Sequence, residues 1–155
     1  MKFRPYQLLF AVSVALLIAA ICMPVVQFIE SNGATTSVSN FSIVNPDGTT
    51  SYVVCALGAV LSFTALVNIF AIVVSAFQNF ELQKRTVILS VLLLTGYYIL
   101  LLISSLLLIE GSSIIMKPAL LLPFIALVLN VMCFMSVRRT EAKILSQASG
   151  FRLRD

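Results

Sequence analysis

Few side chains inside this apolar sequence have the chemistry of a site, and most of those are uncharged. Asn68 and Asn130 lie well inside two long apolar runs. A buried amide forms hydrogen bonds between helices or contacts a ligand. A third run adds hydroxyl groups, at Thr95, Tyr97, Tyr98, Ser104 and Ser105. We favour a hydrogen bond between Asn68 and Asn130 that joins two helices, and a ligand site is the alternative.

A short charged cluster at 77–86 contains Glu81, Lys84 and Arg85. We interpret this segment as a cytoplasmic turn whose bases lie at the lipid headgroups, and a regulatory or partner-binding loop is the alternative. Glu81 stands four residues before Arg85, so the two side chains would pair if the segment is helical.

The sequence gives little support for catalysis or metal binding. Histidine, the commonest general base and metal ligand, is absent, and the three cysteines form no CxxC pair. The apolar runs contain no Asp, Glu, Lys or Arg, whereas proton and ion pathways place ionisable groups inside the membrane. We therefore expect no catalytic residue, no cofactor and no metal.

Four apolar runs must position the polar side chains, at 6–28, 52–77, 86–109 and 118–137. Of the 155 residues, 60% are hydrophobic and 10% are charged, against roughly a quarter charged in soluble domains. Each run can cross a hydrocarbon core of about 30 Å as a helix. The alternation of a membrane β-strand is missing. The sequence predicts an all-α membrane protein, a single domain built as a four-helix transmembrane bundle.

The basic residues predict the direction in which the chain crosses the membrane. If the N-terminus is cytoplasmic, every Lys and Arg except Lys117 lies on the cytoplasmic side. This bias sets topology, so both termini are predicted to be cytoplasmic. The expected topology anchors are Lys2, Arg4, Lys84, Arg85, Arg138, Arg139 and Lys143. The basic residues flank the apolar runs, and no aromatic residues that could stack on nucleobases lie between them. We therefore expect no nucleic-acid partner.

The two ends of the chain leave alternatives open. The run 6–28 follows two bases as a secretory signal would, but its apolar core is longer than about 7–15 residues. We expect an uncleaved span rather than a removed signal. The tail 138–155 is expected to continue the fourth helix towards Gly150, with Ile144 and Leu145 near one face. We favour anchoring of this basic tail on anionic lipid, with docking to a partner as the alternative.

The largest segment outside the membrane is the outer loop 29–51. Its Asn-Pro-Asp-Gly sequence at 45–48 is typical of a type I turn and predicts a short β-hairpin over the helix ends. Asn40 begins an Asn-Phe-Ser triplet that fits a glycosylation acceptor.

Small residues predict where the first two helices pack. Such residues let helix backbones approach in lipid. The expected packing positions are Ala11, Ala15, Ala19, Gly58, Ser62 and Ala65, together with Asn68 and Asn130. Cys22 and Cys55 lie towards the same membrane surface, which leaves a disulfide between them as the alternative. We expect free thiols that pack as small apolar groups.

Three regions carry a resemblance to a known family. They are MKFRPYQLLFAV with Pro24 and Phe28, LVNIFAIVVSAFQNFELQKR, and KPALLLPFIALVLNVMCFMSVRRTEAKILS with a late RLR at 152–154. The sequence resembles an uncharacterised family of small four-span membrane proteins typical of Bacteroidota. This resemblance implies a bacterial cytoplasmic membrane and four spans, and it assigns no active site.

These observations favour a non-catalytic accessory or scaffold subunit that packs against a larger membrane complex, with a membrane-protein partner or further copies of itself. The alternative is a binding or transport protein for an apolar or lipid-like solute, which Asn68 and Asn130 would contact. An enzyme ranks third, because it would need residues from a partner.

Overall fold

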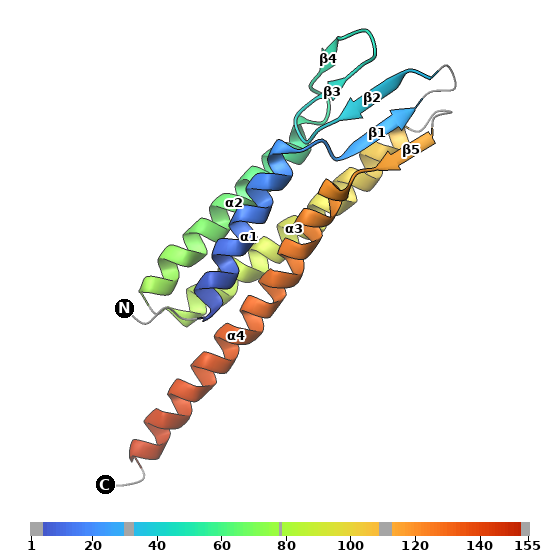
Figure 1. Cartoon of the computed structure of the whole chain (residues 1–155). Coiled ribbons are helices and arrows are strands. Elements are labelled where there is room, and N and C mark those ends of the chain that lie inside the picture. The colour runs from blue at the N-terminus through green and yellow to red at the C-terminus, as the bar shows by residue number, and fades with distance from the viewer. Residues whose placement is uncertain (1–4, 30–32, 78, 109–112, 153–155) are drawn as a thin grey trace.

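The computed structural model describes residues 5–29, 33–77, 79–108 and 113–152, and Lys2 and Arg4 lie outside them. Four helices run side by side as a bundle, with a small sheet at one end (Figure 1). The helices are α1 (Pro5–Cys22), α2 (Cys55–Ala76), α3 (Phe80–Leu108) and α4 (Leu121–Arg152), and the 3-10 turn η1 (Pro118–Leu120) leads into α4.

Three helices, within the described residues, are long and apolar enough to cross a bilayer, and α1 is a shorter apolar helix. This arrangement indicates a multi-pass membrane protein. The four predicted helices are confirmed, but their bounds differ from the predicted spans. The predicted span 6–28 is too long, because α1 ends at Cys22 and the chain turns at Pro24 into a strand.

The segment 77–86 is mostly helix rather than loop. The first helical residue of α3 is Phe80, so Glu81, Lys84 and Arg85 all lie on α3. Asn79 precedes the helix and its Oδ1 accepts a hydrogen bond from the backbone N–H of Leu82 at 3.1 Å. A side-chain oxygen in this position satisfies one of the free N–H groups of the first turn, which explains the early helix start.

The expectation of an all-α fold is wrong, because five short strands form an antiparallel sheet. The strands are β1 (Val26–Ile29), β2 (Thr35–Val38), β3 (Ile43–Val44), β4 (Thr50–Ser51) and β5 (Ser113–Met116), in the order β4-β3-β2-β1-β5. The predicted hairpin is confirmed as β3–β4. In its turn the N–H of Gly48 donates to Asn45 O at 3.0 Å, and Gly48 has a φ of 76°, which glycine adopts without steric penalty.

Strand β5 joins two connections that are far apart in the sequence. It follows α3 but pairs with β1, which follows α1, and Phe28 lies opposite Ile114. Just beyond the strand, the N–H of Lys117 donates to Val25 O at 3.1 Å. The connection between α3 and α4 is therefore fixed to the end of α1.

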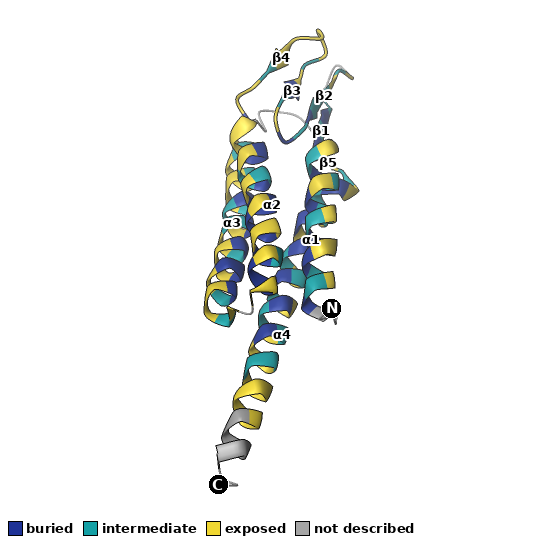
Figure 2. Cartoon of the chain, turned by 90° about the vertical axis from the view of Figure 1, so that its left-hand side faces the viewer, coloured by how far each residue is buried: buried dark blue, intermediate teal, exposed yellow. Residues whose placement is uncertain are grey.

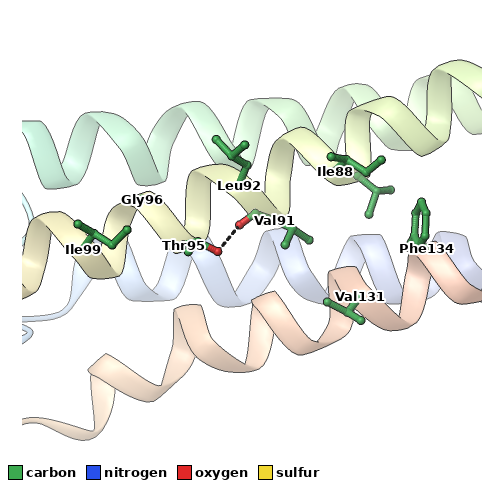
Figure 3. Close-up of a pocket in the computed structure, with 9 residues that line it drawn as sticks. Ile88, Val91, Leu92, Thr95, Gly96, Ile99, Val131 and Phe134 are labelled. Atoms are coloured by element: carbon green, nitrogen blue, oxygen red, sulfur yellow. Dashed lines mark hydrogen bonds between the residues drawn. The ribbon is translucent and has the colours of Figure 1, made fainter.

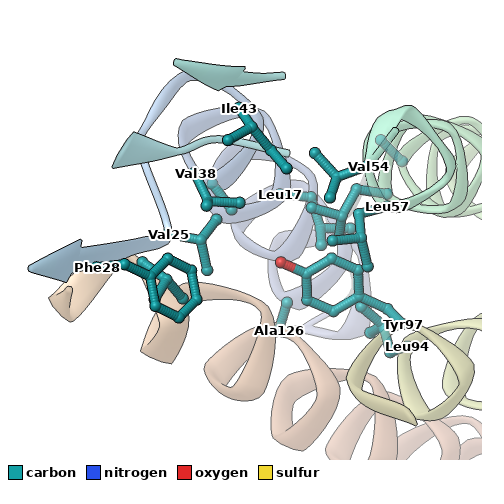
Figure 4. Close-up of a cluster of buried hydrophobic side chains, with 14 residues drawn as sticks. Leu17, Val25, Phe28, Val38, Ile43, Val54, Leu57, Leu94, Tyr97 and Ala126 are labelled. Atoms are coloured by element: carbon teal, nitrogen blue, oxygen red, sulfur yellow. The ribbon is translucent and has the colours of Figure 1, made fainter. Parts of the chain in front are cut away.

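One face of the sheet packs onto the helix ends. Val25, Phe28 and Val38 from the sheet side belong to the same buried cluster as Leu57 and Tyr97 from the helices (Figure 4). A second buried cluster fills the other end of the bundle and contains Tyr6, Phe10, Ala71, Val87, Cys133 and Val137. Many outward-facing residues of the bundle are exposed (Figure 2). Many of these exposed residues are large and apolar, as a lipid-facing surface requires.

Helix α4 is the longest element and continues past the ends of the other helices (Figures 1 and 2). At about 1.5 Å per residue its 32 residues extend about 48 Å, well beyond a hydrocarbon core of about 30 Å. The prediction that the tail continues the fourth helix is confirmed. The predicted stop at Gly150 is wrong, since the helix runs to Arg152.

Candidate functional site

A buried polar network joins all four helices in the middle of the bundle. It consists of Ser13 on α1, Asn68 on α2, Ser90 on α3 and Asn130 on α4, and each of these residues is fully buried. Asn68 donates its Nδ2 to Ser13 Oγ at 3.2 Å. Ser90 donates its hydroxyl to Asn68 Oδ1 at 2.8 Å and accepts from Asn130 Nδ2 at 3.0 Å. Since the partners of each bond come from different helices, the network fixes the helices relative to one another.

The predicted direct bond between Asn68 and Asn130 is wrong, because Ser90 stands between the two amides. Asn68 and Asn130 are the two amides expected from the sequence, whereas Ser13 and Ser90 were not among the expected residues. Both serines interrupt apolar runs, but several other serines do so too, and the sequence alone therefore does not single them out.

Two amide side chains in the bundle keep unused hydrogen-bonding capacity. Asn130 Oδ1 is buried without a partner, and Gln83 is fully buried with neither Oε1 nor Nε2 paired. Gln83 lies in the inward stripe of α3 that continues through Val87 and Ser90. Gln83 was not expected to be buried, because the segment 77–86 was interpreted as a cytoplasmic turn.

Asn40 in the outer loop is the centre of a second buried network. Its Nδ2 donates to Ala20 O at 2.7 Å, and its Oδ1 accepts from the hydroxyl of Tyr97 at 2.8 Å. Its backbone oxygen accepts from the N–H of Gly58 at 2.7 Å. Asn40 thus satisfies a carbonyl in the last turn of α1 and an N–H in the first turn of α2, both of which lack partners within their helices. Because Asn40 is fully buried, the folded chain does not expose it as a glycan acceptor.

The predicted small-residue packing of α1 does not match its buried side. Ala11 and Ala15 are exposed and Ala19 is half-buried, whereas Ser13 and Leu17 are fully buried.

On α2, Gly58 and Ala65 are buried and Ser62 is half-buried. Gly58 lies under the ring of Phe41 from the outer loop, where a Cβ would meet the ring at 2.5 Å. The outer loop, and not α1 alone, therefore explains the glycine at position 58.

The cysteines are free thiols, as expected from the sequence. Cys22 and Cys55 are exposed, and Cys133 is buried.

Charged side chains gather where α3 begins and α4 leaves the bundle. Lys84 Nζ donates to both carboxylate oxygens of Glu141, at 3.0 and 3.1 Å. Glu81 pairs with Arg85 at 3.7 Å, which confirms the predicted pairing four residues apart. The guanidinium of Arg138 lies 5.8 Å from the ring centre of Phe134. Arg139 and Lys143 are exposed on the same part of α4.

Two apolar grooves lie on the outside of the bundle. The α3–α4 groove has a volume of about 520 Å³, and the residues that line it are Val87, Ile88, Val91, Leu92, Thr95, Gly96, Ile99, Val131 and Phe134 (Figure 3). The α2–α3 groove has a volume of about 440 Å³ and is lined by Phe63, Leu66, Val67, Phe70, Leu82, Arg85, Thr86 and Leu89. Neither groove is lined by Asn68 or Asn130, so neither offers the solute contacts that the transport hypothesis requires.

The comparisons with known proteins add a family assignment. A search of curated proteins finds no match. Residues 7–146, which include all four members of the buried polar network, match the family described as Domain of unknown function (DUF4293). Because the match extends over most of the sequence, this chain belongs to the DUF4293 family.

Proposed function

We propose that the chain is a non-catalytic accessory or scaffold subunit of a larger membrane complex, and that a partner binds the part of α4 that leaves the bundle. The observation that carries this proposal is the continuation of the inward-facing stripe of α4 beyond the other helices. The buried members of this stripe are Pro123, Ala126, Asn130, Cys133 and Val137.

Two turns beyond Val137, the same side of α4 bears Ile144, which is 40% exposed, beside Leu145, which is 64% exposed. The salt bridge between Lys84 and Glu141 marks the polar level where the bundle ends. Ile144 and Leu145 follow Glu141 along α4, so they lie outside the apolar part of the bundle. Lipid tails cannot cover apolar groups there. Burying such a side chain against a protein contributes about 1.5–3 kcal/mol, which favours a protein partner.

The proposed orientation places this end of the bundle in the cytoplasm of a bacterial cell and the sheet outside. Lys84, Arg85, Arg138 and Arg139 lie at the α4 end, while Lys117 lies beside the sheet. Positive charge of this kind is retained in the cytoplasm.

The orientation is tested by thiol labelling in a background that lacks the three native cysteines. With a membrane-impermeant reagent, Asp47→Cys should react in intact cells, and Lys143→Cys should react only after lysis. The reverse pattern would show the opposite orientation.

The partner is tested by a photo-crosslinking amino acid placed at position 144 in living cells. The matched control is position 146, which is also exposed but faces the other side of the helix. We expect a discrete crosslinked membrane protein from position 144 and little from position 146. Equal labelling, together with recovery of only single chains after gentle extraction, would refute the proposal. A crosslink to a second copy would instead show that the complex consists of this chain alone.

A further inference from the structure

The α2–α3 groove differs from the α3–α4 groove in one respect that bears on its ligand. Both are apolar, but among the residues that the structure describes one charged residue, Arg85, lines the α2–α3 groove and none lines the α3–α4 groove. The rest of the α2–α3 groove is apolar apart from Thr86, whose hydroxyl already donates to Leu82 O at 2.8 Å.

The guanidinium of Arg85 is available to a ligand. The side chain is 80% exposed, and its ion pair with Glu81, which is 74% exposed, is long, at 3.7 Å. Ion pairs between exposed side chains at this distance are weak and easily exchanged. A guanidinium presents donors in a planar fork that fits two oxygens of a phosphate.

The depths of the groove residues in the membrane suit an amphipathic ligand. Arg85 lies in the second turn of α3, close to the bridge between Lys84 and Glu141, and is therefore near the headgroups. Leu89 lies one turn further along α3, and Phe63 and Phe70 continue the groove on α2. A molecule in the groove would thus meet a cation at the headgroup end and apolar side chains towards the bilayer centre.

We propose that the α2–α3 groove binds an anionic phospholipid, with the lipid phosphate on Arg85 and an acyl chain along Phe63, Phe70 and Leu89. The net negative headgroup is selected because a zwitterionic headgroup brings its own cation near Arg85. This assignment goes beyond the proposed partner site, which lies on another helix and outside the bilayer.

The absence of tryptophan from the sequence permits a matched fluorescence experiment. Leu89→Trp places the reporter in the α2–α3 groove, and Ile88→Trp places it in the α3–α4 groove at nearly the same depth. Each full-length variant is reconstituted in vesicles of phosphatidylcholine and phosphatidylglycerol, with bromine, a quencher, on the chains of one lipid or the other. We expect brominated phosphatidylglycerol to be enriched near Leu89→Trp about fivefold over its fraction in the vesicle. This factor corresponds to the attraction of about 1 kcal/mol between one basic side chain and anionic lipid. At Ile88→Trp the quenching should follow the bulk composition.

Two charge variants complete the test. Arg85→Gln should abolish the enrichment at Leu89→Trp, and Glu81→Gln should increase it by removing the competing carboxylate. Equal quenching at both reporters, or enrichment that persists in Arg85→Gln, would overturn the proposal. Protection of Leu89→Trp from both brominated lipids would also overturn it, because a protein surface would then occupy the groove.

Discussion

The hydroxyl of Tyr97 donates to Oδ1 of Asn40 at 2.8 Å, and this bond ties the third helix to the loop that follows the first. The other side-chain bond of Asn40 reaches Ala20 O, and its backbone oxygen reaches Gly58 N. A single loop residue therefore connects α1, α2 and α3 at the sheet end of the bundle.

Replacing Asn40 should strongly destabilise the fold. In Asn40→Ala the buried Tyr97 hydroxyl and Ala20 carbonyl lose their partner, and each unpaired buried group costs about 1–3 kcal/mol. We expect a loss of about 2–4 kcal/mol in the free energy of unfolding, measured by denaturant titration in mixed micelles. Tyr97→Phe should cost about 1 kcal/mol. If the effect of Tyr97→Phe is the same in Asn40→Ala as in the unchanged protein, the two residues are not coupled.

The glycine at position 58 should be required only while Phe41 covers it. Gly58→Ala places a Cβ against the Phe41 ring and should destabilise by about 1–3 kcal/mol. In a Phe41→Ala background the same substitution should become stabilising by up to about 1 kcal/mol, since alanine is the better helix former. Thermal unfolding of the four combinations measures this change of sign, and the same sign in both backgrounds would contradict the packing argument.

Replacing Ser90 at the centre of the buried polar network should lower the free energy of unfolding more than replacing Asn130 at its end. Ser90→Ala removes two interhelical hydrogen bonds, each of about 0.6 kcal/mol in membranes, and should lower stability by about 1 kcal/mol. Asn130→Leu removes one of these bonds and also removes the unpartnered Oδ1, so its cost should be smaller. Unfolding free energies of the two variants test this order. A larger loss for Asn130→Leu would show that Asn130 has a further role.

The bridge between Lys84 and Glu141 should respond to charge exchange. Lys84→Glu places two carboxylates together and should reduce stability by up to about 1 kcal/mol, because both side chains are about one-quarter exposed. Adding Glu141→Lys should recover most of this loss. The melting temperature should show the effect at low salt and lose much of it at high salt, where the interaction is screened. A loss that is unchanged by salt would indicate a packing defect instead.

The parts of the fold that were predictable are those that carry a local signal. The length of the apolar runs identified four helices, and the turn chemistry at Gly48 identified the β3–β4 hairpin. The pairing of β5 with β1 was not predictable, because no local pattern relates residues separated by α2 and α3.

The buried face of each helix was hard to predict for a physical reason. In water, polar residues mark the outward face of a helix, but in lipid both faces are apolar. Ala11 and Ser13 are both small residues of α1, yet only Ser13 faces the bundle. Asn68 and Asn130 were recognised because an amide is conspicuous in an apolar run, whereas Ser90 resembles other serines until the packing is known.

The pairing of β5 with β1 has a consequence for synthesis of the chain. Val26 is made early and its partner Met116 is made only after α2 and α3. The backbone N–H and C=O groups on one edge of β1 therefore stay unpaired while two further helices enter the bilayer. The sheet is completed only when β5, just before α4, has been synthesised. A ribosome that stalls before β5 therefore leaves a nascent chain in which one edge of β1 has no partner strand.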